Sequence, residues 1–297
     1  MKIGVIMGGN SSERNVSILT GNEIIKNLDS KKYTAIPIII EKEKDLFSKL
    51  SQIDFAFIAL HGIFGEDGRI QSILEAYNIP YSGSGLLTSA LCMDKNMTKK
   101  ILCFENINTA DWTLLNNKEN IPIDKISSLD YPLVIKPNSG GSSIGTTIAH
   151  NIHDVRNGVE SAFLYDKEVI IEKYLPGEEI TCCVLDGKLL PIISIEPTSC
   201  FFDYKSKYTS LGSKDTIALY DHCLMKKLEE VSIKCWNIFK CKAYVRIDII
   251  ISNNEPYVLE LNTLPGMTPF SLFPKSALAD NIHFNELLDK IIHLSLN

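Results

Sequence analysis

Residues 132–149 read PLVIKPNSGGSSIGTTIA, two short apolar runs on either side of a loop rich in glycine and serine. Glycines let backbone N–H groups turn toward an anion, and Ser142 and Ser143 add hydroxyl donors. Lys136 places a cation beside the loop. The Gly-x4-Gly-Lys-Ser/Thr order of a Walker A loop is absent, and a strand follows in place of a helix. We therefore predict an anion-binding loop between two strands, with a flexible hairpin loop as the alternative.

A second pattern places polar side chains at alternate positions of two apolar runs, in Arg246-Ile247-Asp248 and Glu260-Leu261-Asn262. Alternate side chains of a strand share one face, so a hairpin around residues 252–254 would bring the two polar pairs together. Two carboxylates and an amide oxygen are hard ligands suited to Mg²⁺ that bridges nucleotide phosphates. The guanidinium group could stabilise an anion beside the metal. A solvated strand face with a surface salt bridge is the alternative.

The first 85 residues alternate predicted strands (2–7, 34–40 and 55–60) with helical patterns. This alternation implies a parallel sheet with covered faces, in which ligands bind beyond the carboxyl ends of the strands. Glu13 and His61 both follow a predicted strand end, so we expect them to face one crevice. A capped or core histidine is the alternative for His61.

The rest of the chain has a plausible domain boundary at Ser82-Gly83-Ser84-Gly85. Helices are expected over 45–53, 86–104, 220–239 and 284–296. Strands are expected over 132–135, 146–149, 168–172, 179–185, 188–195, 245–251 and 256–261.

The composition limits the class of protein. The length of 297 residues suggests about two domains. The chain has 36 acidic and 30 basic residues, and this mildly acidic balance argues against a nucleic-acid partner. The content of 45% hydrophobic residues excludes global disorder. No apolar run reaches the roughly 18 residues of a membrane helix, and the N-terminus does not read as a signal peptide. Without an export signal we expect the eight cysteines to be reduced, mostly core thiols of a cytoplasmic protein. A zinc site is disfavoured, because the cysteines show no CxxC spacing and no histidine at ligand spacing from a cysteine pair.

Two further segments carry weaker signals. In residues 172–179, EKYLPGEE, a connector could present its backbone to an adenine edge and a carboxylate to ribose hydroxyls; a charged turn is the alternative. Residues 263–272, TLPGMTPFSL, place an irregular backbone directly after the predicted metal ligands, and loops on a rigid scaffold often carry function. A bare turn is the alternative there.

Together these motifs resemble the D-alanine–D-alanine ligases of the ATP-grasp superfamily, nearly end to end. Many carboxylate ligases share the ATP-grasp parts, whereas Glu13, the His61 motif and Tyr208 are more specific to this family. The motifs are MGG at 7–9, SER at 12–14, ALHG at 59–62, GEDG at 65–68, YSGSG at 81–85, MDK at 93–95, the loop from Lys136, IEKYL at 171–175, DYKSKY at 203–208, RID at 246–248 and ELNTLPGMT at 260–268.

The resemblance implies an α/β ATP-grasp fold with an N-terminal Rossmann-like parallel-sheet domain. Residues 1–85 would form the substrate-binding domain, 86–178 the central ATP-grasp lobe, and 179–297 the C-terminal lobe with the metal and acceptor sites. The enzyme implied is a bacterial cytoplasmic homodimer that makes D-alanyl-D-alanine for peptidoglycan, using ATP and a D-alanyl phosphate intermediate.

The resemblance also implies ligand sites. ATP would meet Lys95, Lys136, Ser142, Ser143, Glu172, Lys173, Leu175, Glu179, Phe201 and Lys207. Two Mg²⁺ ions, with Mn²⁺ as an alternative, would bind Asp248, Glu260 and Asn262. The two D-alanine molecules would meet Glu13, His61, Tyr208, Arg246, Gly266, Ser271 and Leu272.

Specific roles follow from the same likeness. Glu13 would hold the first ammonium group, and Ser142 and Tyr208 would hydrogen-bond with Glu13. Arg246 and the Gly266 N–H would stabilise the tetrahedral oxyanion. Ser271 and the Leu272 backbone would receive the second carboxylate.

One departure and several rival functions stay open. Residues 139–141 are Ser-Gly-Gly, where many members have Arg-Glu-Gly, so the contacts of this loop are undecided. Tyr208 favours D-alanine over D-lactate as acceptor, but related ligases for D-serine, D-lactate or L-amino acids share the fold. A nicotinamide oxidoreductase is disfavoured by the missing GxGxxG spacing. A non-catalytic nucleotide-binding regulator is disfavoured because Arg246, Asp248, Glu260 and Asn262 are all present.

Overall fold

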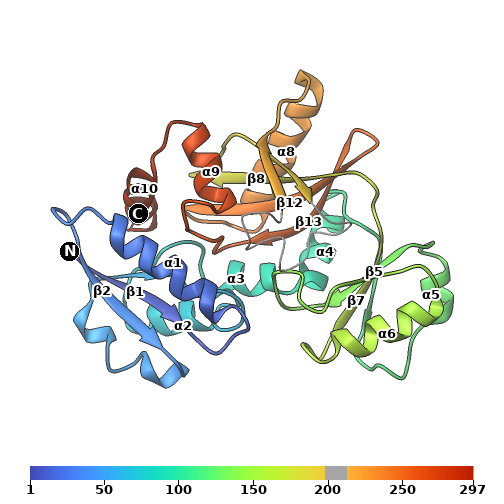
Figure 1. The fold of residues 1–297 in the computed structure, drawn as a ribbon, viewed down its shortest axis with the longest axis horizontal. Helices are drawn as coiled ribbons and strands as arrows, with labels where there is room; N and C mark the ends of the chain where they lie inside the picture. Colours follow the sequence, from blue (N-terminus) through green and yellow to red (C-terminus); the bar gives the residue numbers. More distant parts are fainter. Residues whose placement is uncertain (198–212, 297) are drawn as a thin grey trace.

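The computed structural model describes residues 1–197 and 213–296 and contains three sheets with flanking helices (Figure 1). The sheet built from the N-terminal residues lies beside the C-terminal helix, and the sheet of the central residues lies at the opposite end of the molecule. The largest sheet lies between and above them. This mixed architecture, with a parallel sheet at the N-terminus, confirms the predicted fold class.

The N-terminal sheet has the order β2-β1-β3, and its strands are parallel: β1 is Lys2–Gly8, β2 Thr34–Ile40 and β3 Phe55–Ile58. Every residue of β1 after Lys2 is buried, as expected of a parallel strand covered on both faces. Helices α1 (Arg14–Asn27) and α2 (Arg69–Ala76) flank the sheet.

The predicted helix over residues 45–53 is wrong. The chain forms two single 3-10 turns there, Glu43–Asp45 and Leu50–Gln52. Leu46 and Leu50 are buried while most of their neighbours are exposed, so helical spacing of two apolar residues produced the error. A segment of this length forms too few helical hydrogen bonds to offset the unfavourable free energy of helix nucleation.

The central sheet is antiparallel, with the order β4-β7-β5-β6. Its strands are β4 (Trp112–Leu115), β5 (Leu133–Pro137), β6 (Thr147–Ala149) and β7 (Val169–Lys173). Helices α5 (Ile123–Ser127) and α6 (Ile152–Ala162) belong to this lobe. Neither helix nor β4 was predicted, although Asn151 caps α6 by accepting from the N–H groups of His153 and Asp154.

The largest sheet has the order β11-β10-β8-β12-β13, with β9 paired to β8. Its strands are β8 (Glu178–Leu185), β9 (Lys188–Leu189), β10 (Ile193–Pro197), β11 (Ser213–Ile217), β12 (Tyr244–Ser252) and β13 (Glu255–Asn262). The accompanying helices are α8 (His222–Ile238), α9 (Leu272–Ala279) and α10 (Phe284–Leu296). The strand predicted over 188–195 is two strands, since the chain leaves the pairing around Pro191.

The helical stretch predicted over 86–104 is two helices, α3 (Leu86–Met93) and α4 (Lys95–Phe104). Asp94 separates them with extended backbone angles, and its carboxylate accepts the Met97 N–H at 2.9 Å as the α4 cap. Buried side chains of both helices pack in the core of the largest sheet, not in that of the central sheet. The division at residues 85 and 178 stays a proposal.

One hydrophobic core joins the two ends of the chain. It combines β1 and β3 with α10 and with Tyr244 and Phe273, whose rings meet edge to face at 5.5 Å between centroids. A second core lies between the largest sheet and α8, and a third between the central sheet and α6. The N-terminal and C-terminal segments are therefore held by shared apolar burial.

In the described part of the chain no helix has the length and apolarity that a bilayer crossing requires. The described cysteines are free thiols, and most are buried. Burial raises the pKa of Cys182 to about 12, so that this thiol is protonated and inert near neutral pH.

The shared core predicts a large cost for Phe273→Ala. Removing a fully buried ring should lower the free energy of unfolding by about 3–5 kcal/mol, because a cavity opens between the two ends of the chain. Urea unfolding monitored by circular dichroism measures this. Leu278→Ala, on the same helix but 55% exposed, is the matched control and should cost less than about 1 kcal/mol. Equal losses for the two variants would contradict the shared core.

Candidate active site

Two adjoining cavities lie where the central and largest sheets face each other. The larger, of about 410 Å³, is lined by the glycine-rich loop, β7 and β12–β13. The smaller, of about 110 Å³, is lined by N-terminal residues and by the start of α9. Asp248, Glu260, Gly141 and Glu179 line both, so the two carboxylates predicted to bind metal stand at the junction of the cavities.

The β12–β13 register positions the polar quartet of the hairpin. Arg246 lies opposite Asn262, and Asp248 lies opposite Glu260. A register shift follows directly after Asp248, so the regular pairing is interrupted beside the site and continues from Ile249 opposite Val258. The hairpin predicted from the sequence is confirmed, and it brings both pairs together on the cavity side.

Arg246 and Asp248 form a two-pronged ion pair. Nε donates to Oδ1 at 2.9 Å and Nη2 donates to Oδ2 at 2.7 Å. Thr181 of β8 also donates its hydroxyl to the carboxylate. Burial alone lowers the pKa of Arg246, but the Asp248 carboxylate outweighs burial and raises the pKa further above its ordinary value. The guanidinium is therefore permanently charged and held rigidly at the wall of the smaller cavity.

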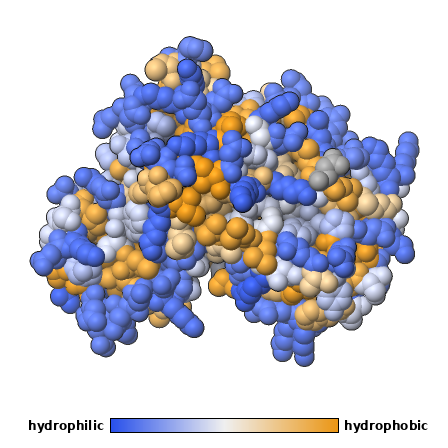
Figure 2. Space-filling view, turned by 180° about the vertical axis from the view of Figure 1, so that it is seen from behind, coloured by the Kyte–Doolittle hydropathy of each residue, from blue (hydrophilic) through white to orange (hydrophobic). Residues whose placement is uncertain are grey.

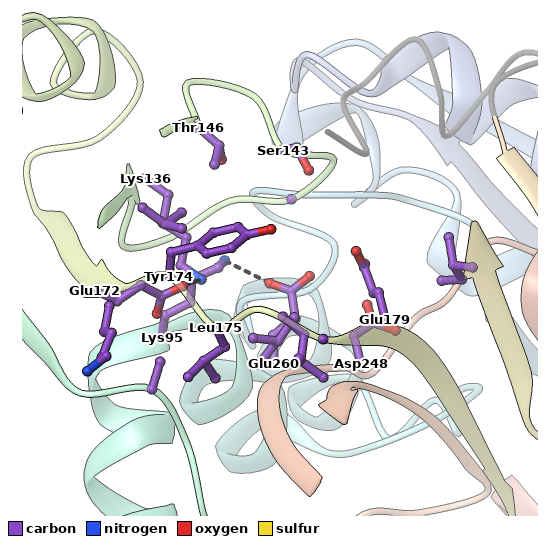
Figure 3. Close-up of a pocket in the computed structure, with 18 of the residues that line it drawn as sticks. Lys95, Lys136, Ser143, Thr146, Glu172, Tyr174, Leu175, Glu179, Asp248 and Glu260 are labelled. Atoms are coloured by element: carbon purple, nitrogen blue, oxygen red, sulfur yellow. Dashed lines mark hydrogen bonds and ion pairs between the residues drawn. The ribbon is translucent and has the colours of Figure 1, made fainter. Parts of the chain in front are cut away.

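Lys95, the first residue of α4, spans the larger cavity toward the hairpin. Its ammonium lies 3.2 Å from Glu260 Oε2 and donates to the Gly140 carbonyl at 2.5 Å (Figure 3). Its side chain is only 8% exposed, so the charge is concentrated in the cavity. One lysine thus links the predicted phosphate loop to a predicted metal ligand.

The base of the glycine-rich loop is held by Asn138. Its amide donates to Asp94 Oδ1 and to Glu168 Oε2, both at 3.0 Å, and its carbonyl accepts the Asn96 N–H. This buried side chain ties the loop to the N-terminus of α4, where Lys95 begins. This role of Asn138 was not predicted, because its partners Asp94 and Glu168 are distant in the sequence.

The tip of the loop turns at Ser142 and Ser143, which both have φ of 56°, in the left-handed region that non-glycine residues rarely adopt. This geometry aims Ser142 Oγ at the Glu13 carboxylate, to which it donates a buried hydrogen bond. The loop thereby contacts the N-terminal unit.

Glu172 lies between two lysines at the far side of the larger cavity. Its Oε1 is 2.5 Å from Lys136 Nζ and its Oε2 is 2.9 Å from Lys99 Nζ. Burial by itself raises the pKa of Glu172, but the two lysines outweigh burial and hold the pKa at about 2. Lys99 was missed by the sequence analysis, since no local pattern separates a buried helical lysine from an exposed one.

The smaller cavity contains Glu13 and His61, which the sequence predicted to face one crevice. The His61 Nε2 lies 3.1 Å from the Thr20 hydroxyl of α1, and the imidazole also hydrogen-bonds the Leu264 backbone. Burial lowers the pKa of His61 despite the nearby Glu13, so the ring is neutral at pH 7. His61 is therefore suited to orienting neighbours by hydrogen bonds and not by charge.

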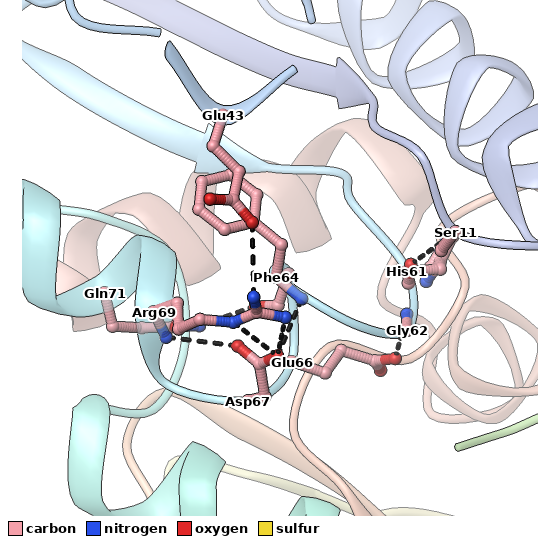
Figure 4. Close-up of polar contacts among 10 residues, drawn as sticks. Ser11, Glu43, His61, Gly62, Phe64, Glu66, Asp67, Arg69 and Gln71 are labelled. Atoms are coloured by element: carbon pink, nitrogen blue, oxygen red, sulfur yellow. Dashed lines mark hydrogen bonds and ion pairs between the residues drawn. The ribbon is translucent and has the colours of Figure 1, made fainter. Parts of the chain in front are cut away.

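The GEDG turn at residues 65–68 presents a further carboxylate, Glu66, to this cavity (Figure 4). Asp67 holds the turn by accepting from the Phe64 N–H at 2.8 Å and from the Arg69 guanidinium at 2.7 Å. Glu66 Oε2 accepts the Gly62 N–H, and burial, with repulsion from Glu13, raises the pKa of Glu66 to about 8. Glu66 was part of a motif that supported the resemblance, but it was not predicted as a site residue.

The start of α9 closes the smaller cavity. Ser271 precedes the helix and its hydroxyl accepts the Thr268 N–H at 3.1 Å, while Gly266, Ser271 and Leu272 all line the cavity. A Cβ at Gly266 would meet the Ser271 hydroxyl at 3.0 Å, so glycine permits this close turn. The N–H groups at a helix start favour a bound carboxylate.

The remaining predicted residues divide into two groups. Lys173, Leu175 and Glu179 line the larger cavity, as does Ser143. Tyr208, Phe201 and Lys207 lie outside the described residues.

The predicted metal ligands Asp248, Glu260 and Asn262 offer oxygen donors. Within residues 1–197 and 213–296 no group of three or more His, Cys, Asp or Glu side chains is arranged to hold a metal ion. Two carboxylates on directly opposed strand positions, with an amide oxygen beside them, fit a hard cation whose other ligands are phosphate and water.

The low pKa of Glu172 predicts how stability depends on pH. The pKa is about 2 in the folded protein against 4.5 for the free group, so the pairing stabilises the fold fully above about pH 4.5. This contribution is lost as pH falls toward 2. The Glu172→Gln variant should therefore lose less stability than the native chain over that range, in urea unfolding at several pH values. If the free energy of unfolding fell equally with pH in the two proteins, the stabilising pairing of Glu172 would be contradicted.

Comparison with known proteins identifies the family to which this chain is related. A family model described as the D-ala D-ala ligase C-terminus matches residues 96–293, and one for the N-terminus matches residues 2–52 and 45–84. D-alanine--D-alanine ligases of Clostridium botulinum (strain Loch Maree / Type A3) and Clostridium perfringens (strain SM101 / Type A) are 55% and 50% identical. Each alignment covers 100% of this chain and 99% or 98% of the relative.

Solved structures agree with these relatives. The D-alanine--D-alanine ligase of Bacillus anthracis complexed with ATP has a TM-score of 0.92 at 48% identity, over 100% of this chain and 97% of that one. The VanG D-Ala:D-Ser ligase of Enterococcus faecalis has a TM-score of 0.86 at 31% identity, over 99% of both chains.

Proposed function

We propose, from the premise that this chain belongs to the D-alanine–D-alanine ligase family, how its two cavities perform the reaction of that family. The chain joins two D-alanine molecules to D-alanyl-D-alanine at the expense of ATP, for peptidoglycan synthesis. The observation that carries the proposal is the junction of the cavities at Asp248 and Glu260. A lysine-lined space for a polyphosphate there opens onto a smaller space with carboxylates and an arginine.

ATP binds in the larger cavity in this proposal. Lys95 and Lys136 contact its phosphates together with the N–H groups and hydroxyls of the glycine-rich loop. The β7 edge and the connector after it, with Lys173, Leu175 and Glu179, receive the adenine and ribose. These residues come from both β-rich lobes, so the nucleotide lies between them.

Asp248, Glu260 and Asn262 would hold Mg²⁺, or Mn²⁺ in its place, beside the phosphates. Bound there, the metal would supply charge neutralisation on the phosphoryl group, which is the dominant requirement of phosphoryl transfer. Lys95 contributes to the same end, since its ammonium already contacts Glu260 at 3.2 Å.

The reaction proceeds in two steps. The carboxylate of the first D-alanine attacks the γ-phosphorus, giving an acyl phosphate and ADP. The amine of the second D-alanine then attacks the acyl carbon, and phosphate leaves. Phosphorylation is required because a free carboxylate has no good leaving group.

The smaller cavity orients both amino acids. Glu13, held by Ser142, binds the first ammonium group, and the neutral His61 supports that region through hydrogen bonds. Arg246 and the Gly266 N–H stabilise the oxyanion that forms at the acyl carbon. Ser271 and the Leu272 N–H, at the start of α9, receive the carboxylate of the second D-alanine.

The protein is also proposed to work in the bacterial cytoplasm as a homodimer. The view from behind shows apolar surface gathered near the middle of the molecule within a mostly hydrophilic periphery (Figure 2). Leu87 of α3 and Phe104 of α4 are 59% and 84% exposed, and exposed apolar residues of this size are suited to subunit contact. Light scattering after gel filtration tests this assembly: a homodimer should have twice the mass of the 33.2 kDa chain.

The overall proposal is tested by incubating the protein with ATP, MgCl₂ and D-alanine and detecting the product by mass spectrometry. D-alanyl-D-alanine and ADP should form in equal amounts. Omitting the metal or adding EDTA should abolish product formation. ATP hydrolysis without dipeptide, under conditions where the protein is folded, would contradict the proposal.

The metal assignment predicts that Glu260→Gln lowers kcat by at least about a hundredfold, because the site loses a carboxylate facing the phosphates. Glu255→Gln, on the same strand but in an exposed pair with Lys227, is the matched control and should keep full turnover. The urea concentration at the midpoint of unfolding should be the same for both variants as for the native protein, within experimental error. Native turnover in Glu260→Gln would refute the metal role.

Acceptor choice separates this function from that of the D-Ala:D-Ser ligase with the similar fold. Identity to the Clostridium botulinum D-alanine--D-alanine ligase named above is 55%, against 31% to that neighbour, so D-alanine is the expected acceptor. In competition with D-serine and D-lactate at pH 7, kcat/KM for D-alanine should be at least about tenfold higher. Preference for either rival would overturn the acceptor assignment and leave the ATP site intact.

A further inference from the structure

Lys99 on α4 is a fully buried lysine, with a side chain exposed fraction of 0%. Lysine is almost never fully buried unless its charge is paired, because removing an ammonium group from water is costly. Lys99 does not itself line either of the two cavities. Its position behind the cavity wall calls for a physical explanation.

The contacts of Lys99 are those of an ammonium ion. Nζ donates to Thr109 Oγ1 at 2.8 Å and to the Ala110 carbonyl at 3.1 Å, and it lies 2.9 Å from Glu172 Oε2. The Trp112 ring centroid is 5.4 Å from the same nitrogen. Two oxygens accept hydrogen bonds from Nζ, and the carboxylate and the indole ring add attraction for a positive charge.

Glu172 connects this buried lysine to the cavity. One carboxylate oxygen faces Lys99 and the other faces Lys136, at 2.9 and 2.5 Å. Lys136 and Glu172 both line the larger cavity (Figure 3). The three charges therefore form a row from the interior to the cavity: ammonium, carboxylate, ammonium.

We propose that Lys99 is a positioning residue for the nucleotide: it neutralises Glu172 from behind, so that the Lys136 ammonium stays available to the phosphates. Two ammonium groups and one carboxylate leave one net positive charge at the cavity wall. Without Lys99, Glu172 would cancel Lys136 and leave none. This inference rests on the proposed ATP site in the larger cavity.

Stability alone does not account for the row. A buried ion pair is often no more stabilising than an apolar pair of similar volume, because the desolvation cost offsets the attraction. The arrangement does change the charge that faces a polyphosphate. Lys99 also holds the Ala110 carbonyl, and Ala110 lines the cavity, so a purely structural role is the competing explanation.

The two explanations differ in how affinity depends on phosphate. Loss of wall structure would weaken adenosine and ADP alike, since both need the same pocket. Loss of net charge would weaken ADP and leave adenosine nearly unchanged. The ratio of the two dissociation constants, adenosine over ADP, therefore isolates the charge effect.

The test compares Lys99→Met with the native protein by isothermal titration calorimetry with adenosine and with Mg-ADP. The charge role predicts that the ratio falls about tenfold in Lys99→Met, the size of one charge-assisted hydrogen bond. A ratio unchanged within about twofold would overturn the proposal. Lys227→Met removes an ammonium paired with Glu255, the first residue of β13, and neither residue lines the two cavities. It is the matched control and should keep the native ratio.

The double variant Lys99→Met/Glu172→Gln adds a rescue. Removing both partners leaves the Lys136 charge uncancelled, so the ratio should return to within about threefold of the native value. If Lys99→Met does not fold, the double variant is compared with Glu172→Gln alone, in which both ammonium groups remain. A ratio about tenfold lower in the double variant supports the proposal, and equal ratios in the two variants overturn it.

Failure of the proposed function would be recognised separately. In that case the native protein itself would show no gain in affinity from adenosine to ADP. A native protein with a clear gain, and a Lys99→Met variant with the same gain, would leave the ATP site in place and refute only the role of Lys99.

Discussion

The site depends on the antiparallel register between β12 and β13. This register sets Asp248 opposite Glu260 and Arg246 opposite Asn262, and it shifts directly after Asp248. Because side chains alternate along a strand, a slip of β13 by one residue would turn Glu260 and Asn262 to the other face of the sheet. The two cavities would then lose one of the two carboxylates at which they meet.

Ion pairs hold the cationic side chains at the walls of the two cavities. Lys95 contacts Glu260, Arg246 contacts Asp248, and Lys136 contacts Glu172. These three cations are thus each paired with a carboxylate at a cavity wall. In the proposed function, a bound polyphosphate would exchange partners among charges already in position, which would reduce the reorganisation that the reaction requires.

Much of this was predictable from the sequence. Strand alternation identified the faces of Arg246 and Asp248, and strand ends placed Glu13 and His61 in one crevice. Lys99 and Asn138 were not found, because their roles depend on which distant residues the fold brings to them. The helix predicted over 45–53 failed for the related reason that local spacing says nothing about how many of its residues are covered. Roles on residues 198–212 depend on resemblance alone.

In the proposed reaction, a carboxylate oxygen of the first D-alanine attacks the γ-phosphorus where the two cavities meet. The most direct measurement uses D-alanine labelled with ¹⁸O in its carboxylate, followed by mass spectrometry of the phosphate released with the dipeptide. Acyl phosphate formation predicts that one labelled oxygen is transferred to each phosphate, because the C–O bond breaks when the amine attacks. Phosphate free of label, with dipeptide formed at the normal rate, would contradict the claim.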